Sequence, residues 1–557
     1  MQNDQCKLVL EERSSAGMSN PLVSVRTVSK KRAAQDSPPG LNKRRKASTA
    51  TSETQDYSDA RIAIATARGE AATGGTPYLS TRSNNDLLDS VPTLVSAALR
   101  RASSSAKKLY ANRLGDGLKQ DIQYEKELLH LLPSHIASRL FQSTLEALAF
   151  DTEALKDDED VQWKTHQDQN TSKQAASTLL AEVIRLFLSS STASFVLPVA
   201  IAHNFQLTTQ IQRDLMGCHA LTTLDLTGQK QIQDKTLANI IGHLPLLQDL
   251  VLRSCTLAGD QTVIKAATTC QHLRKVNLNY TAVTSQGLST LLSTTPNLTT
   301  LKLANVNNLN DQTIDRILTH ANSTATFIPL ANLQSLKLRS TQISDVGIGR
   351  ILSLTPSLIT LDISFTQTRT LDFLTLSSRP LVKLLLSGLT LKRNSLIKFF
   401  KSLPLTLKLL KIASMGQRTN TKFSGEADQV DSLVVKALTN ALRDIHLDTL
   451  SLGSNPKLMN HIGNIRGLLG VASRCKVLDL SNSINTASKH ARLDRDVLEG
   501  LLGEDETESR LEVLVLDGTR CEDDCADVIA QLGNLESLHL RNSRLTGKPL
   551  LCFLWLY

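Results

Sequence analysis

The stretch Leu221-Thr222-Thr223-Leu224-Asp225-Leu226 carries the pattern that decides the fold, L-x-x-L-x-L, in which apolar residues fill positions one, four and six. The pattern recurs eleven more times in one phase. Its first position is then filled by Leu247, Leu273, Leu298, Leu333, Leu358, Leu381, Leu407, Leu447, Cys475, Leu511 and Leu535. Most copies start about 25 residues after the previous one. A unit of this length cannot bury its apolar face alone, so neighbouring units are expected to stack around a shared core.

After each of these short strands the chain changes to the spacing of a turn and a helix. Position nine holds a small polar residue or a cysteine in most copies, such as Cys255, and such a side chain can bond to the backbone of a turn. Apolar residues then recur at helical intervals, as they do over 237–241. Asp234, Asp311 and Asp345 precede three of these segments and are candidate helix caps.

Together these features resemble the leucine-rich repeat, in the ribonuclease-inhibitor-like and Cys-containing subclasses found in F-box/leucine-rich-repeat adaptors. The resemblance covers about 215–545. We therefore predict an α/β fold over 216–547, a leucine-rich-repeat solenoid built as a horseshoe of about twelve β-strand/helix repeats.

The N-terminal segment 1–105 is predicted to be a disordered basic tail, because its Ser, Thr, Ala, Asn and Gly cannot bury enough apolar surface to fold. Residues 1–110 hold 17 Lys and Arg against 10 Asp and Glu, so most of the net charge of +9 lies there. The remainder of the chain, 111–557, is close to neutral when taken together, which argues against a globally basic nucleic-acid-binding surface.

Two basic clusters separated by ten residues resemble a bipartite nuclear localisation signal, which an import receptor recognises. The clusters consist of Lys30, Lys31, Arg32, Lys43, Arg44, Arg45 and Lys46. We predict a nuclear protein, with additional presence in the cytoplasm left open. The alternative is a solvated run of charge with no receptor.

Residues 106–215 show helical spacing and are predicted to form an α-helical cap that covers the apolar edge of the first repeat. Within them, one short motif resembles the opening of an F-box, the helical motif by which ubiquitin-ligase receptors dock an adaptor. The motif comprises Leu132, Pro133, Ile136, Leu140 and Phe141. It departs from the F-box pattern because His135 stands where an acidic residue is usual and no clear further F-box helices follow. A cap, an adaptor-docking motif and both together remain open.

No sequence pattern indicates catalysis, a metal or a cofactor. There is no phosphate-binding loop, and Cys521 and Cys525 lack a second ligand pair. No apolar run reaches the roughly 20 residues that span a bilayer, so no membrane association is predicted. Residues 548–557 form an apolar C-terminal tail with no capping element.

What remains as a candidate for function is the concave surface, to which positions three, five and seven of each repeat point. Copies two to eight place basic residues there. These are Arg253, Lys275, Lys302, Lys337, Arg339, Lys383 and Lys411. We predict that they bind a protein partner with an acidic or phosphorylated segment, with Arg339 and Lys337 as the anchor. The alternative is a solvated face without a specific partner.

The predicted function is therefore a non-enzymatic protein-interaction scaffold or adaptor of the nucleus that binds a protein partner on its concave face. One alternative is the substrate receptor of a cullin-type ubiquitin ligase, whose adaptor would dock at 125–150. A second alternative is a nucleic-acid-associated factor of the DNA-repair type, although direct contact with nucleic acid is not expected.

Overall fold

The computed structural model describes residues 7–11, 22–26, 129, 132–133, 135–145, 177–178, 180–202, 205–324, 330–375, 380–415, 430–455, 458, 462–483, 493–502 and 509–546. These residues belong to two compact units, divided between Leu298 and Thr299. The N-terminal unit contains the described residues from 129 to 298. The C-terminal unit contains those from 299 to 546 together with 7–11 and 22–26.

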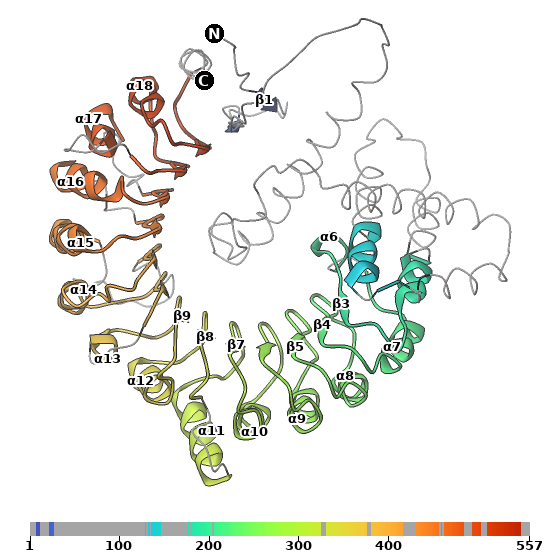
Figure 1. The fold of residues 1–557 in the computed structure, drawn as a ribbon. Coiled ribbons are helices and arrows are strands. Elements are labelled where there is room, and N and C mark those ends of the chain that lie inside the picture. Colours follow the sequence, from blue (N-terminus) through green and yellow to red (C-terminus); the bar gives the residue numbers. More distant parts are fainter. Residues whose placement is uncertain are drawn as a thin grey trace, which may run out of the picture. The chain divides into compact units, whose positions relative to one another are not determined.

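The N-terminal unit is built on parallel strands, each paired with the next in the chain. They are β3 (Ser194–Val196), β4 (Thr223–Asp225), β5 (Asp249–Val251) and β6 (Lys275–Asn277). Its helices include α6 (Val199–Ala202), α7 (Thr209–Met216), α8 (Asp234–Ile241), α9 (Asp260–Thr269) and α10 (Ser285–Thr294). Helices α8 to α10 lie on one side of the strands (Figure 1). Helical segments over 135–145 and 180–187 precede β3.

The C-terminal unit repeats the same arrangement. Its parallel strands are β7 (Thr300–Lys302), β8 (Ser335–Lys337), β9 (Thr360–Asp362), β10 (Lys383–Leu385), β11 (Leu409–Lys411), β12 (Thr449–Ser451), β13 (Val477–Asp479), β14 (Val513–Val515) and β15 (Ser537–His539). The α-helices are α11 (Asp311–Thr324), α12 (Asp345–Ser353), α13 (Asp372–Thr375), α14 (Arg393–Phe400), α15 (Ser432–Asp444), α16 (Ile462–Ala472), α17 (Arg495–Leu498) and α18 (Ala526–Ala530). The 3-10 helices are η4 (Glu499–Leu502) and η5 (Asp523–Cys525).

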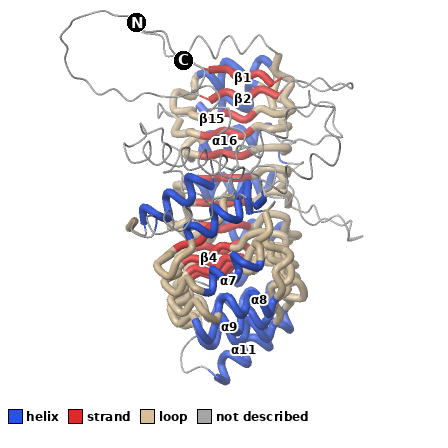
Figure 2. The backbone as a smooth tube through the Cα atoms, turned by 90° about the vertical axis from the view of Figure 1, so that its right-hand side faces the viewer, coloured by secondary structure: helices blue, strands red, loops and turns tan. Residues whose placement is uncertain are grey.

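Two strands from the N-terminal tail extend the sheet of the C-terminal unit. Strand β2 (Leu22–Arg26) pairs antiparallel with β15, and β1 (Lys7–Glu11) pairs with β2 (Figure 2). The rest of 1–105 lies outside the described residues, and so do the localisation-signal residues 30–32 and 43–46 and the tail 548–557.

The leucine-rich-repeat fold is confirmed by thirteen parallel strands that alternate with helices in the two units. Twelve of them coincide with the twelve predicted copies. The thirteenth, β3, lies within 106–215, where only helices were predicted. Phe195 occupies position four of this strand and is fully buried, but Thr192 at position one hides the L-x-x-L-x-L pattern.

The turn after each strand has one conformation in both units. Position eight is left-handed in all twelve copies, from Gly228 (φ 82°) to Asn542 (φ 54°). A threonine at position nine donates to the carbonyl of position six in its own repeat, as Thr281 does to Leu278 at 2.7 Å. The Cys255 thiol, at the same position, donates instead to the carbonyl of Leu226, position six of the preceding repeat, at 3.0 Å. This confirms the predicted role of position nine.

The helix-start aspartates do not cap their own helices, so that prediction is wrong. Asp234 is the first residue of α8, and its carboxylate instead accepts hydrogen bonds from the backbone of Gly259 (2.8 Å) and Thr262 (2.9 Å) in the next repeat. In the same way, the Asp311 carboxylate accepts the backbone N–H of Ser344, and the Asp345 carboxylate accepts the backbone N–H of Arg369. These carboxylates therefore join one repeat to the next.

Candidate partner-binding site

The strand face of the C-terminal unit is the surface formed by positions three, five and seven of its repeats. On β7 and β8 the middle leucines are buried, and the flanking residues on the opposite side are half-buried. Lys302 and Lys337 lie directly opposite each other, since the two strands pair in register. Arg339 follows two residues after Lys337 on the same face. We call Lys302, Lys337 and Arg339 the basic cluster.

Arg339 is stacked on an aromatic ring from the following repeat. Its guanidinium carbon Cζ lies 4.7 Å from the centre of the Phe365 ring. Phe365 occupies position eight, where its φ of 59° is unusual for a bulky side chain. The ring in turn covers Gly388, and a Cβ at that glycine would overlap the ring. The Phe365 ring therefore contacts both the Arg339 guanidinium and Gly388.

One acidic residue borders the basic cluster. Asp362 pairs in register with Lys337 from the other side and is only 4% exposed. Its carboxylate accepts the backbone N–H of Ser364 at 3.1 Å, so one oxygen is already bound within its own turn. Asp362 is therefore the acidic residue that the strand register places beside Lys337.

The structure brings together only part of the predicted basic stripe. Lys383 is half-buried on β10, whereas Lys411 on β11 is only 5% exposed and is not a surface residue. In the N-terminal unit Lys275 is ion-paired with Asp249 at 2.8 Å, and Arg253 is half-buried beyond the end of β5. The three residues of the basic cluster therefore form the best-defined candidate site.

Further along the same unit the strand face changes its charge. Asp479 on β13 and Asp517 after β14 lie near His539 and Arg541. Burial raises the pKa of the Asp517 carboxyl, although Arg541 acts in the opposite direction. Burial also lowers the pKa of the His539 imidazole to about 4, and the Arg541 cation adds to this shift. This end of the strand face would not attract an anion.

The F-box-like segment forms the helix over 135–145. Phe141 on this helix is 3% exposed and packs against Phe187 (5.3 Å between ring centres) and Phe195 (5.9 Å). Since Phe195 is the buried residue of β3, the helix covers the first strand, as a cap would. Leu132 precedes this helix and lines one pocket with Phe141, Phe187 and Phe195. Ile136 and Leu140 are half-buried, and Pro133 is exposed.

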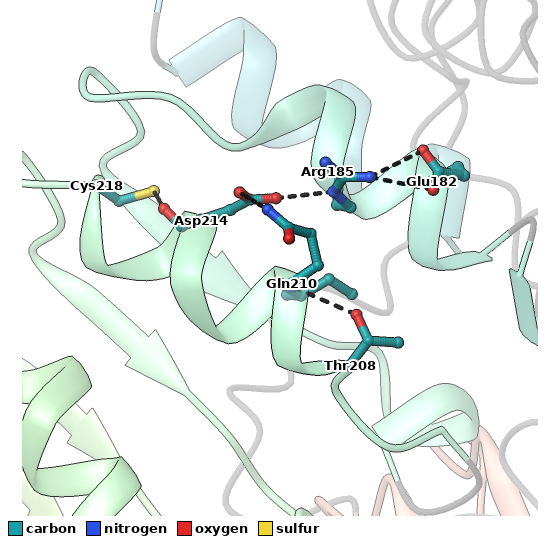
Figure 3. Close-up of polar contacts among 7 residues, drawn as sticks. Glu182, Arg185, Thr208, Gln210, Asp214 and Cys218 are labelled. Carbon is teal, nitrogen blue, oxygen red and sulfur yellow. Dashed lines mark hydrogen bonds and ion pairs between the residues drawn. The ribbon is translucent and has the colours of Figure 1, made fainter. Parts of the chain in front are cut away.

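A polar network joins the helix over 180–187 to α7 (Figure 3). Arg185 donates to Asp214 of α7 at 2.9 Å and to Glu182 at 3.2 Å. The bond to Asp214 raises the pKa of Arg185. Thr208 caps α7 by accepting the N–H of Ile211 at 3.3 Å. These residues are held by one another and join the two helices.

The buried thiols are packing residues. Burial raises the pKa of Cys255, Cys270 and Cys475 to about 12, so these thiols stay protonated near neutral pH. Among the described residues, no group of three or more His, Cys, Asp and Glu side chains is placed to hold a metal ion. Within that same part of the chain, no helix has the length and apolar character needed to cross a membrane.

The sequence alone did not reveal the role of Phe365. The available signal was an aromatic residue at position eight, where glycine, serine and asparagine predominate. Neither the stacking on Arg339 nor the space provided by Gly388 could be derived without the neighbouring repeats in place.

No known family profile matches this chain. It is similar to an internalin from Listeria monocytogenes, with 18% identity over 61% of this chain and 86% of that one and a TM-score of 0.32. It is also similar to a leucine-rich-repeat protein of Leptospira interrogans (20% identity, 64% and 84% coverage, TM-score 0.35). A chain of the yeast Rad7 and Elc1 complex matches with 14% identity, 77% and 95% coverage and a TM-score of 0.34. Similarity at this level does not reveal what this chain binds.

Proposed function

We propose that this protein is a non-enzymatic adaptor of the nucleus that binds a protein partner on the strand face of its C-terminal unit. The observation that carries the proposal is the basic cluster, in which two lysines on neighbouring strands lie opposite each other beside an arginine stacked on Phe365. Such a cluster suits an acidic segment of a partner. The nuclear location rests on the two basic sequence clusters in 30–46 alone.

The fold does not require these charges. Position five of the other repeats in this unit also holds uncharged residues, such as Leu385, Ser451 and Val515. Like charges directly opposite each other on adjacent strands are unfavourable. A binding role therefore explains Lys302 and Lys337 better than a structural role does.

Charge reversal tests this proposal. Replacing Lys302, Lys337 and Arg339 by Glu should remove most of the partners that co-purify with the wild-type chain, as identified by mass spectrometry. A matched control replaces Lys401, Lys436 and Arg443 by Glu, because these exposed residues of the same unit lie at or near α14 and α15. An identical set of partners for both variants would refute the proposed site.

A second candidate function is that of a substrate receptor of a cullin-type ubiquitin ligase. It is favoured by the two faces of the helix over 135–145. Phe141 and Leu145 are buried in the cap, whereas Ile136 and Leu140 on another face retain exposed surface. The helix could therefore cap the repeats and contact an adaptor as well.

Co-purification separates this candidate from a simple adaptor. Recovery of the ligase adaptor with the wild-type chain, and its loss when Pro133 and Ile136 are replaced by Ser, would support a receptor. Failure to recover it from cells that contain the ligase would remove this candidate and leave the binding site on the strand face untouched.

A further inference from the structure

The last parallel strand of the C-terminal unit, β15, has a different kind of neighbour on each side. It pairs with β14 on one side and with β2 on the other, and β2 pairs in turn with β1 (Figure 2). We call β1 and β2 the N-terminal strand pair. The frame leucines of this last copy, Leu535, Leu538 and Leu540, are 8%, 7% and 5% exposed, whereas those of the preceding copy are fully buried. The last repeat of a solenoid lacks a repeat on one side, so its core needs another cover there.

The strand register places an apolar row of the N-terminal strand pair in line with the core side of β15. Val25 is the partner of Leu538, and Leu8 is the partner of Val25. Residues opposite each other in antiparallel strands belong to one face of the sheet, and every second residue returns to that face. The positions that share the face of Leu538 are all apolar, namely Leu8, Leu10, Val23 and Val25. The positions of the other face are mixed and hold Lys7, Val9, Glu11, Leu22, Ser24 and Arg26.

The direction of β2 distinguishes it from the strand of a further repeat. Strands β7 to β15 run parallel, and each is joined to the next by a segment that contains a helix, whereas β2 runs antiparallel to β15. A further repeat would leave another apolar edge to be covered. The N-terminal strand pair instead ends the sheet at β1, whose first and last residues are Lys7 and Glu11. Charged residues on an edge strand discourage pairing with another strand.

We propose that the N-terminal strand pair caps the repeats at β15, and that an uncapped β15 pairs with β15 of a second copy of this chain. Without the cap, the backbone N–H and C=O groups along one edge of Ser537–His539 lose their partners in β2. Such an edge is a template for pairing with another chain. In a two-fold symmetric dimer β15 meets its own copy antiparallel, which is the direction in which it accepts β2. This inference goes beyond the proposed function and does not depend on the basic cluster.

Removal of the N-terminal strand pair tests both parts of the proposal. A variant that lacks residues 1–27 keeps the two basic clusters of 30–46. In analytical ultracentrifugation we expect this variant to form dimers whose fraction rises with concentration, and the full chain to stay monomeric over the same range. A peptide of residues 1–27 should return the variant to a monomer, and the same peptide with Val25→Pro should not, because proline cannot donate a hydrogen bond to a neighbouring strand. A variant that stays monomeric would overturn the self-pairing, and equal action of the two peptides would overturn the cap.

Two substitutions at neighbouring residues of β2 separate capping from a general effect of charge. In the full chain, Val25→Asp places a carboxylate in the apolar row that is in line with Leu538, whereas Ser24→Asp places one on the other face of the sheet. A charge on the core side of a sheet is costly to bury. We therefore expect Val25→Asp to dimerise as the deletion variant does, and Ser24→Asp to stay monomeric. The same oligomeric state for both variants would overturn the proposed role of the apolar row.

Cysteine pairs test whether the cap comes from the same chain and in this register. Ser24 and His539 are register partners, so their Cα atoms are about 4.5–5.5 Å apart and within the range of a disulfide. Ser24 and Ser537 are diagonal neighbours about 7–8 Å apart and form the control pair. In a chain with Cys6→Ser and Cys552→Ser, we expect oxidised glutathione to link the partner pair within one chain and to leave the control pair unlinked. Links between two chains, or equal linking of both pairs, would overturn the proposed cap.

Discussion

At the scale of single residues, position eight of each turn requires a positive φ, which glycine adopts without strain and most other residues do not. Gly388 has a φ of 66°, and a Cβ there would overlap the Phe365 ring. We expect Gly388→Ala to destabilise the chain by about 2–4 kcal/mol, from backbone strain and overpacking together. Urea denaturation measures this. Gly533→Ala is the control, because a Cβ at Gly533 meets nothing within 4 Å, and an equal effect of both would contradict the explanation.

The burial of His539 predicts how the stability of the chain depends on pH. Its pKa is about 4 in the folded chain because it is buried, and about 6.5 when unfolded. The unfolded chain therefore gains a proton first as the pH falls, and stability is lost between about pH 6.5 and 4. The loss should be about 2–4 kcal/mol and should be absent in His539→Gln. Parallel pH profiles of the two proteins in urea denaturation would show that the folded imidazole takes up its proton normally.

At the scale of elements, the aspartate that joins α8 to the next repeat can be tested. Burial alone would raise the pKa of Asp234, but the hydrogen bonds from Thr262, Gly259 and Gln261 outweigh it, and the pKa is lowered. Its contribution is thus present above about pH 4 and is lost as the pH falls through the lowered pKa. Asp234→Asn should cost about 1–3 kcal/mol at pH 7 and much less at low pH. Urea denaturation at several pH values checks this, with the exposed Asp496→Asn as control. A loss that did not depend on pH would contradict the role of the charge.

The helix over 135–145 allows a second test at this scale. Phe141 is in contact with Phe187 and Phe195, whereas Ile136 is half-buried on another face. Phe141→Ala should destabilise the cap by about 3–5 kcal/mol, and Ile136→Ala should cost clearly less. Hydrogen exchange in α7 and β3 would report the difference. Greater exchange in Ile136→Ala than in Phe141→Ala would mean that the other face anchors the cap.

At the scale of the whole molecule, the repeats could be predicted because the apolar positions are periodic and the period sets the stacking. Strand β3 could not be predicted in this way, because Thr192 and Phe195 stand at positions one and four, where the first recognised copy has Leu221 and Leu224. The hydrogen bonds from Asp234 to the next repeat could not be predicted either, because they depend on the position of that repeat and not on the helix that Asp234 begins.

The candidate site was predictable in part for a related reason. Alternation along a strand places Lys302, Lys337 and Arg339 on one face, and this requires only the frame of the repeat. The burial of Lys411 and the pairing of Lys275 with Asp249 depend on surrounding residues, so the sequence overestimated the extent of the basic surface.

The carboxylate bonds between repeats also bear on how such a chain can change in length. Asp234 binds the start of the next helix, and Asp260, one repeat later, binds Thr284 in the same manner at 2.8 Å. The segment from one aspartate to the next therefore begins and ends with the same kind of connection. Duplication or deletion of that whole segment would recreate the connection at the new junction, whereas a cut elsewhere would break it. The solenoid can thus gain or lose repeats during evolution without a new interface having to arise.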